Sequence, residues 1–208
     1  MRVTRFPYEI PGWGVGEIWV RDGIVVQHEL ASEEIRACSP GFAEGFAGQP
    51  VGISGHGSSG PRAEPSDPAT WCRNGGAGLP TGNVAGKPRR KRADIVSDLS
   101  RRIEAHLNGV PTSYDGVVID LAWATPLQRE LAVAARAIPW GEVVSYGDLA
   151  ALAGRPGAAR AAGSFCADNR YSLIIPCHRV VAANGIGGYG AAGPALKLRL
   201  LTLEGVNL

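Results

Sequence analysis

The sequence predicts an α+β fold, in which a small N-terminal α/β unit with a long irregular insertion precedes a mainly helical C-terminal domain. Three observations carry this prediction: an early hairpin signal, a stretch rich in glycine and proline, and a series of capped helices after it. They place the N-terminal α+β domain at residues 1–121, the insertion at 37–92 and the C-terminal domain at 122–208.

A β-hairpin is expected near the N-terminus, and the insertion follows it. Two apolar stretches, residues 16–20 and 24–28, flank an Asp-Gly pair that favours a tight turn. Residues 37–88 then hold 12 of the 29 glycines and 7 of the 15 prolines. A segment with so few periodic apolar residues cannot offset the entropy cost of ordering the chain. We therefore expect residues 37–92 to be poorly ordered, with a basic end.

One helix and one strand are expected between the insertion and residue 121. Aliphatic side chains recur at every fourth position from Ile95 to Leu107, which predicts an amphipathic helix of about four turns that Gly109 ends. His106 on this helix is expected to be a surface residue. Val-Val-Ile-Asp-Leu at 117–121 predicts a strand.

Helices with recognisable ends follow in the C-terminal domain. Thr-Pro-Leu-Gln at 125–128 combines an N-cap, a first-turn proline and a capping-box glutamine, so it begins a helix that runs to about Arg136. Ser145 begins a second helix that stops at Gly154, and an alanine-rich helix covers 158–167. Two short helices joined by a glycine-containing turn suggest a helix-turn-helix in a winged-helix-like domain.

Composition excludes several classes of protein. With 21 basic and 19 acidic residues the formal net charge is +2, and five of the positive charges lie in the run at 87–92. No apolar run approaches the roughly 18 to 20 residues that cross a bilayer, and no signal core follows Met1, so we expect a cytoplasmic protein without a membrane partner. The four cysteines form no C-x-x-C pair, and nothing resembles a phosphate-binding or dinucleotide loop. No cofactor is therefore expected.

Residues 172–181, Ser-Leu-Ile-Ile-Pro-Cys-His-Arg-Val-Val, are the stretch where chemistry is expected. A thiolate at Cys177 would have the adjacent His-Arg pair as electropositive neighbours, and a lowered thiol pKa makes cysteine a nucleophile. The alternative is a buried structural cysteine. His178 need not touch the thiol directly, because successive residues of an extended chain face opposite sides. Glu204 is a candidate carboxylate to orient the imidazole.

Ile-Pro-Cys-His-Arg-Val at 175–180 resembles the active-site signature of the O6-alkylguanine-DNA alkyltransferases, the methylated-DNA–protein-cysteine methyltransferases. The resemblance covers about residues 123–208, because segments at 138–150, 158–163 and 197–205 fall in the family's order and near its spacing. It implies direct-reversal DNA repair, in which the alkyl group of O6-alkylguanine moves irreversibly to Cys177 after base flipping, once per protein molecule. O4-alkylthymine is the further candidate substrate.

The resemblance also implies roles for catalytic residues. Cys177 would accept the alkyl group by direct displacement. His178, bridged by water to the thiol and hydrogen-bonded to Glu204, would act as the base. Asn169 would hold the turn that presents the cysteine, through hydrogen bonds to the backbone.

Further residues would bind double-stranded DNA through its minor groove, with the protein acting as a monomer. Tyr146 would lie beside the flipped nucleotide, Arg160 would fill the gap in the base stack, and Val180 would offer its carbonyl to the exocyclic amine of guanine. Small residues of the recognition helix would let its backbone approach the groove closely. These residues are Ala158, Ala161 and Gly163.

Three positions depart from the family's pattern. Arg170 stands where the family usually has proline, and Gly190 stands where some members carry a serine, so the preferred size of the alkyl group is left open. Cys166 lies on the recognition helix, where core packing is the favoured interpretation over a role in the pocket.

Other functions fit less well. A non-catalytic DNA-binding relative would lack the cysteine, which is present, and a cysteine hydrolase normally takes its base from a distant segment. A zinc site would need His28, Cys38, His56 and Cys72, whose spacings match no standard pattern, so no metal is expected.

Overall fold

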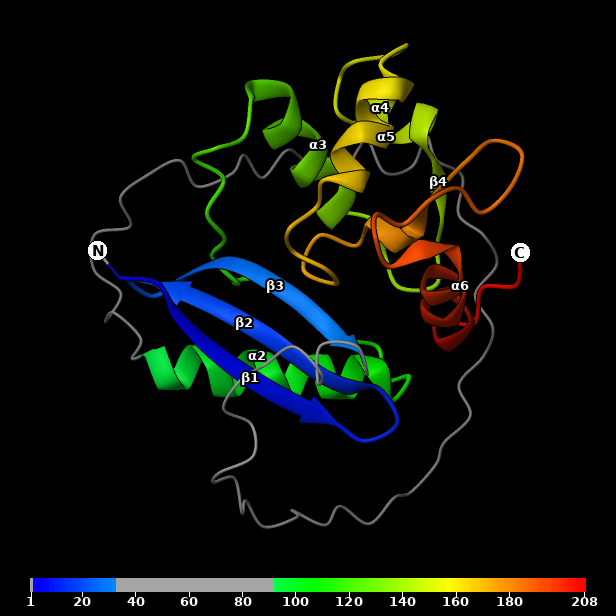
Figure 1. Cartoon of the computed structure of the whole chain (residues 1–208). Coiled ribbons are helices and arrows are strands. Elements are labelled where there is room, and N and C mark those ends of the chain that lie inside the picture. The colour runs from blue at the N-terminus through cyan, green and yellow to red at the C-terminus, as the bar shows by residue number, and fades with distance from the viewer. Residues whose placement is uncertain (1, 33–91) are drawn as a thin grey trace.

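The N-terminal part of the computed structural model is a three-stranded antiparallel sheet with one helix packed against it (Figure 1). The structure describes residues 2–32 and 92–208. Strands β1 (Thr4–Ile10), β2 (Gly14–Arg21) and β3 (Ile24–Ser32) pair in chain order. The expected hairpin is β2 with β3, and its turn residues Asp22 and Gly23 have φ values of 52° and 82°. Both lie in the left-handed region that tight hairpin turns require, so this prediction is confirmed.

Strand β1 was not foreseen from the sequence. Phe6, Tyr8 and Ile10 alternate as a strand requires, but Pro7 interrupts the pattern and argues against a central strand. Among the described residues β1 is an edge strand that pairs only with β2, and an edge tolerates proline because one side of its backbone needs no ladder partner.

Helix α2 (Arg92–Leu107) confirms the predicted amphipathic helix. Leu99, Ile103 and Leu107 are buried in one core with the side chains of the sheet, and Gly109 follows with a φ of 75°. The expectation that His106 lies on the surface is wrong, because its side chain is fully buried. The last turn of α2 faces the C-terminal part of the chain rather than solvent (Figure 1).

The strand predicted at 117–121 does not form. This segment meets β3 at one residue, in an isolated parallel bridge between Val25 and Ile119. The N–H of Val25 donates to the carbonyl of Val118 at 3.0 Å, and the N–H of Asp120 donates back to Val25 at 2.9 Å. The edge of β3 is shared with a second segment, which bridges to it at Tyr171, so no longer ladder can develop along it.

The C-terminal part is mainly helical, and its helix ends agree with the sequence. Thr125 and Ser145 form complete capping boxes at the first two helices, which confirms both predicted starts. A short parallel pairing of two-residue strands brings Val144 beside Val180. The elements are α3 (Pro126–Arg136), β4 (Val144–Ser145), α4 (Tyr146–Leu152), α5 (Ala159–Ala167), the 3-10 turn η2 (Cys177–Arg179), β5 (Val180–Val181) and α6 (Gly193–Leu203).

Several sequence expectations fall outside the described residues. They are the insertion and its basic run, except for Arg92 at the start of α2, and three of the four residues weighed as zinc ligands, Cys38, His56 and Cys72. Within residues 2–32 and 92–208, no helix is long and apolar enough to cross a membrane.

Candidate active site

The turn that leads into η2 is held by one asparagine side chain. The Nδ2 of Asn169 donates to the carbonyl of Ile175 at 2.9 Å, and its Oδ1 accepts from the N–H of Tyr171 at 2.9 Å. Between them, Leu173 has a φ of 66°, an uncommon conformation for a residue with a branched side chain. A strained backbone persists only where its surroundings fix it, so the hydrogen bonds of Asn169 stabilise the turn that carries Cys177.

Strand β3 supports the same turn from the N-terminal part. The N–H of His28 donates to the carbonyl of Arg170 at 2.8 Å, and its Nδ1 lies 2.6 Å from the carbonyl of Ser172. A carbonyl can only accept, so Nδ1 carries the proton, and Nε2 accepts from the hydroxyl of Tyr8 at 2.7 Å. Burial lowers the pKa of His28 to about 4. The imidazole is therefore neutral and bridges the sheet to the active-site turn.

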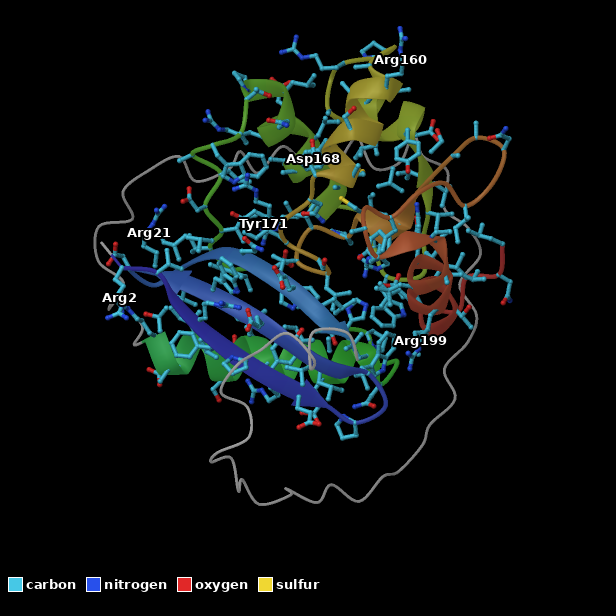
Figure 2. The ribbon with its side chains drawn as sticks, in the orientation of Figure 1. Arg2, Arg21, Arg160, Asp168, Tyr171 and Arg199 are labelled. Carbon is cyan, nitrogen blue, oxygen red and sulfur yellow. The ribbon has the colours of Figure 1, made fainter. Side chains whose placement is uncertain are left out.

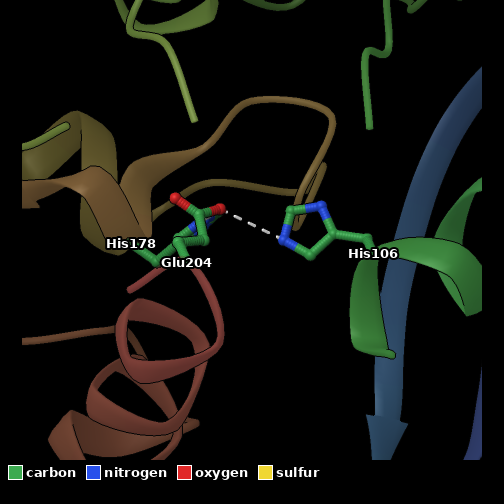
Figure 3. A group of neighbouring side chains, drawn as sticks. All are labelled: His106, His178 and Glu204. Atoms are coloured by element: carbon green, nitrogen blue, oxygen red, sulfur yellow. Dashed lines mark hydrogen bonds and ion pairs between the residues drawn. The ribbon is translucent and has the colours of Figure 1, made fainter. Parts of the chain in front are cut away.

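A buried cluster of charges lies behind Cys177, and its centre is the carboxylate of Glu204 at the end of α6 (Figure 3). Its Oε1 lies 2.9 Å from the Nε2 of His178. The guanidinium of Arg179 donates to both carboxylate oxygens and to the carbonyl of Ile138. The N–H of Gly141 donates to Oε2 at 3.2 Å. The cluster thus joins η2, the loop after α3 and the end of α6.

Helix α2 reaches the same carboxylate. The Nε2 of His106 lies 3.2 Å from Oε1 of Glu204, at ion-pair distance but without the geometry of a full hydrogen bond (Figure 3). The rings of His106 and His178 meet edge to face, with their centroids 5.7 Å apart. Two histidines 72 positions apart in the sequence therefore approach one carboxylate oxygen.

The protonation states of the cluster follow from this geometry. Burial alone would raise the pKa of Glu204, but contacts with His106, His178 and Arg179 hold it well below its usual range, so the carboxylate is charged. Burial lowers the pKa of His178 to about 4, although Glu204 opposes the shift. Neutral His178 donates from Nε2, so its Nδ1 carries the lone pair and has no hydrogen-bond partner within the described part of the chain.

The thiol of Cys177 is buried and protonated. Its side chain is 1% exposed, and both a hydrogen-bonding contact with Cys166 and burial raise its pKa well above the usual range. The expectation that the His-Arg pair lowers this pKa is wrong, because Arg179 points to Glu204. The cation near the sulfur is Lys197, which lowers the pKa of the thiol only in part. A base is therefore needed to form the thiolate.

Lys197 was not singled out from the sequence. Its side chain is fully buried, and its Nζ donates to the carbonyls of Val180 at 2.5 Å and Gly188 at 3.1 Å. The carbonyl of Val180, to which the resemblance assigns a contact with guanine, thus accepts a hydrogen bond from Lys197. Its position among aliphatic residues near the predicted active site could have indicated a buried lysine. An exposed lysine on an amphipathic helix has similar neighbours in the sequence, so this indication is weak.

The remaining candidate residues lie around α4 and α5. Tyr146 is half-buried at the first position of α4, with its hydroxyl close to the loop at 187–188. Arg160 is exposed, and Figure 2 shows it at the outer edge of α5, directed away from the molecule. Ala162 packs into the core, whereas a side chain at Gly163 would meet nothing within 4 Å. Ala158 and Ala161 are half-buried, so small residues line the open side of this helix.

Two of the departures from the family's pattern have structural explanations. Gly190 has a φ of 50°, and a Cβ there would lie 3.0 Å from the carbonyl oxygen of Ala167, so a side chain would be both strained and crowded. Arg170 places its guanidinium 4.6 Å from the ring centre of Trp123, in a cation–π contact at the surface.

A cavity of about 860 Å³ opens between β3 and the active-site turn. Cys166 and Tyr189, which both adjoin Cys177, line it together with His28 and Asn169. Cys177 does not line it, so the cavity lies beside the thiol rather than over it.

One group of described residues has the spacing of metal ligands. The ligand atoms of His106, His178 and Glu204 lie within 4.8 Å of one another. The guanidinium of Arg179 already binds both oxygens of the carboxylate, and a second cation at this position would be repelled. The arrangement therefore fits an ion-pair network better than a metal site.

Known proteins resemble this chain in sequence. A family model described as "6-O-methylguanine DNA methyltransferase, DNA binding domain" matches residues 126–206. A methylated-DNA–protein-cysteine methyltransferase of Methanopyrus kandleri is 38% identical over 120 residues, which cover 58% of this chain and 88% of that protein. One from Salmonella typhimurium is 54% identical over 85 residues, 40% of this chain and 49% of that protein. The chain thus matches about half the length of the Salmonella relative.

Solved structures share the fold. The crystal structure of the O6-methylguanine methyltransferase of Mycobacterium tuberculosis has a TM-score of 0.59 at 24% identity, over 98% of this chain and 93% of that one. The same protein has been solved in complex with DNA, with a TM-score of 0.59 over 96% of this chain and 91% of that one, also at 24% identity.

Proposed function

Because the chain belongs to the methylated-DNA–protein-cysteine methyltransferase family, we propose that it repairs DNA by direct reversal, moving the alkyl group of O6-alkylguanine to Cys177. One observation carries the proposal most. The buried thiol of Cys177 is followed in the chain by His178, whose Nε2 is hydrogen-bonded to the carboxylate of Glu204. This leaves Nδ1 of His178 without a partner among the described residues, which is the arrangement of a nucleophile and its base.

The chemical step follows from the protonation states. The Nδ1 of His178 takes the proton of the Cys177 thiol through a water molecule, and Glu204 stabilises the imidazolium that forms. The thiolate attacks the alkyl carbon, so the S–C bond forms as the C–O6 bond breaks. The guanine leaves with the bonding electrons and takes up one proton, which the imidazolium of His178 returns through water, so that His178 is neutral again. A thioether is a poor leaving group, so each protein molecule acts once.

Neighbouring residues would hold the reacting groups in place. Asn169 supports the turn that carries the acceptor, with hydrogen bonds to residues on both sides of Leu173. Tyr146 would contact the flipped nucleotide, since its half-buried ring lies on the Cys177 side of α4. The carbonyl of Val180, which accepts from Lys197, would also accept from the exocyclic amine of guanine.

Helices α4 and α5 would form the helix-turn-helix that enters the minor groove, in a winged-helix-like domain that acts as a monomer. Arg160 is exposed and free to occupy the place of the extruded base. The open side of α5 carries Ala158, Ala161 and Gly163, which allow close approach to the groove. Degenerate readout in the minor groove suits a protein that must find one lesion in any sequence.

The direct test is incubation with duplex DNA that contains O6-methylguanine, followed by mass measurement of the protein. We expect the mass to rise by one methyl group on Cys177, no further turnover, and no gain for Cys177→Ala. The matched control Cys166→Ser should still accept the group. Multiple turnovers, or binding without a gain in mass, would contradict the proposal; the second result would indicate a non-catalytic protein that recognises alkylated bases.

A further inference from the structure

We propose that His106 is a positioning residue of the active site, which acts through the Glu204 oxygen that it shares with His178 and limits how strongly His178 attracts the thiol proton. The inference rests on the proposed function for its biological meaning. Its physical basis is the contact of His106 with Glu204 at 3.2 Å, beside that of His178 at 2.9 Å.

The position of His106 is well defined by its surroundings. The side chain is fully buried, and its ring packs against Trp140 at 4.7 Å, against Tyr114 at 5.8 Å and against His178 at 5.7 Å between centroids. Nδ1 of His106 has no hydrogen-bond partner among the described residues. A buried imidazole needs a favourable polar contact, and the anionic Oε1 of Glu204 lies 3.2 Å from its Nε2.

The effect of His106 on His178 has a definite sign. A carboxylate stabilises the imidazolium form of His178 in proportion to the negative charge that His178 meets. A neutral imidazole beside an anion is more stable with its proton on the nearer nitrogen, Nε2, so His106 places partial positive charge 3.2 Å from the same oxygen and weakens that stabilisation. In agreement, Glu204 raises the pKa of His178, whereas Arg179 and His106 lower it. Removing the His106 donor should therefore make His178 a stronger base.

Other charges near the pair must be considered, because each could change with pH. The groups that face His106 and His178 come from several elements. They are Glu204 at the end of α6, Arg179 of η2, Cys177 beside His178, Tyr114 in the loop after α2, and Tyr189 in the loop before α6. Burial raises the pKa values of both tyrosines far above neutral. Burial lowers the pKa of both histidines below its ordinary value, to about 4 for His178.

The experiment compares the full chain with His106→Phe and His106→Gln. Phenylalanine keeps the ring but removes the donor, while glutamine keeps an N–H at a similar reach. We would follow two rates against pH: alkyl transfer from O6-methylguanine duplex, and modification of Cys177 by iodoacetamide without DNA. For His106→Phe we expect both rates to fall on the acid side at a pH higher by roughly one unit, while the maximum rate at higher pH is unchanged. His106→Gln should resemble the unmodified chain.

Tyr114→Phe is the matched control, because it alters a ring neighbour of His106 whose hydroxyl has no hydrogen-bond partner among the described residues. Superimposed profiles for His106→Phe and the unmodified chain, or equal shifts in Tyr114→Phe, would overturn the inference. The unmodified protein gives a test that needs no variant. Its imidazole nitrogen resonances at neutral pH must show protonated Nε2 on His106 and bare Nδ1 on His178; a bare Nε2 on His106 would refute it. The iodoacetamide and resonance measurements stand even if no alkyl transfer occurs.

Discussion

Glu204→Gln should separate the structural role of the buried carboxylate from its role in chemistry. The side chain of Glu204 is fully buried, that of Arg179 is 8% exposed, and the guanidinium reaches the carboxylate at 2.9 Å. An amide removes the negative charge and turns N–H groups towards other N–H groups. Breaking a buried pair on one side costs about 3 to 5 kcal/mol, a large share of the roughly 5 to 15 kcal/mol that stabilises most domains.

Urea unfolding measures the first effect, and single-turnover methyl transfer measures the second. We expect Glu204→Gln to lose about 3 to 5 kcal/mol of unfolding free energy and at least about 100-fold in transfer rate. The double variant Arg179→Met with Glu204→Leu removes both charges and should recover much of the stability, because apolar replacement of a buried pair is often neutral. It should not recover transfer. An unfolding free energy for Glu204→Gln within about 1 kcal/mol of the unmodified chain would refute the reasoning.

The other predictions concern the active-site turn, the loop before α6, strand β3 and helix α5. Asn169→Ala should slow transfer and cost about 1 to 3 kcal/mol in urea unfolding, since it leaves the Ile175 carbonyl without its donor; no change in either would contradict its role. Gly190→Ser should lose about 1 to 3 kcal/mol by the same measurement, because of its left-handed φ and the nearby Ala167 carbonyl; greater stability would exclude strain. The pKa of His28 is about 4 when folded and ordinarily about 6.5, so the unfolded chain binds more protons between these values. The contribution of neutral His28 to the unfolding free energy is therefore complete above about pH 6.5 and is lost as pH falls towards 4. In His28→Gln, the unfolding free energy should depend less on pH over that range. Arg160→Ala should slow transfer from duplex DNA while leaving iodoacetamide modification of Cys177 unchanged; equal loss in both would indicate misfolding.

The sequence predicts local elements well where the signals are themselves local. The capping boxes at Thr125 and Ser145 and the Asp-Gly turn depend on residues within a few positions of one another, and the structure confirms them. The strand expected at 117–121 is wrong because strand formation needs a free neighbouring edge. β3 offers that segment one residue only.

In the candidate site too, residues with a local sequence signal could be predicted, whereas properties set by packing could not. Cys177, His178 and Glu204 could be proposed from the signature and its resemblance to a family, but the direction of the thiol pKa could not. That pKa depends on Cys166, Lys197 and burial, which are set by packing between distant segments. His106 was assigned to the surface because four-residue periodicity does not show that the end of α2 is covered by another part of the chain.

The bridge from His28 to the active-site turn limits how this protein can be divided or recombined. The segment that the family model matches, 126–206, contains the thiol, yet its turn is bonded to β3, and the hydroxyl of Tyr171 donates to the carbonyl of Asp120. A chimera that joins this catalytic segment to the N-terminal half of a relative would need a strand with a matching imidazole and a helix ending beside Glu204. The two halves are therefore expected to be inherited together rather than exchanged as independent modules.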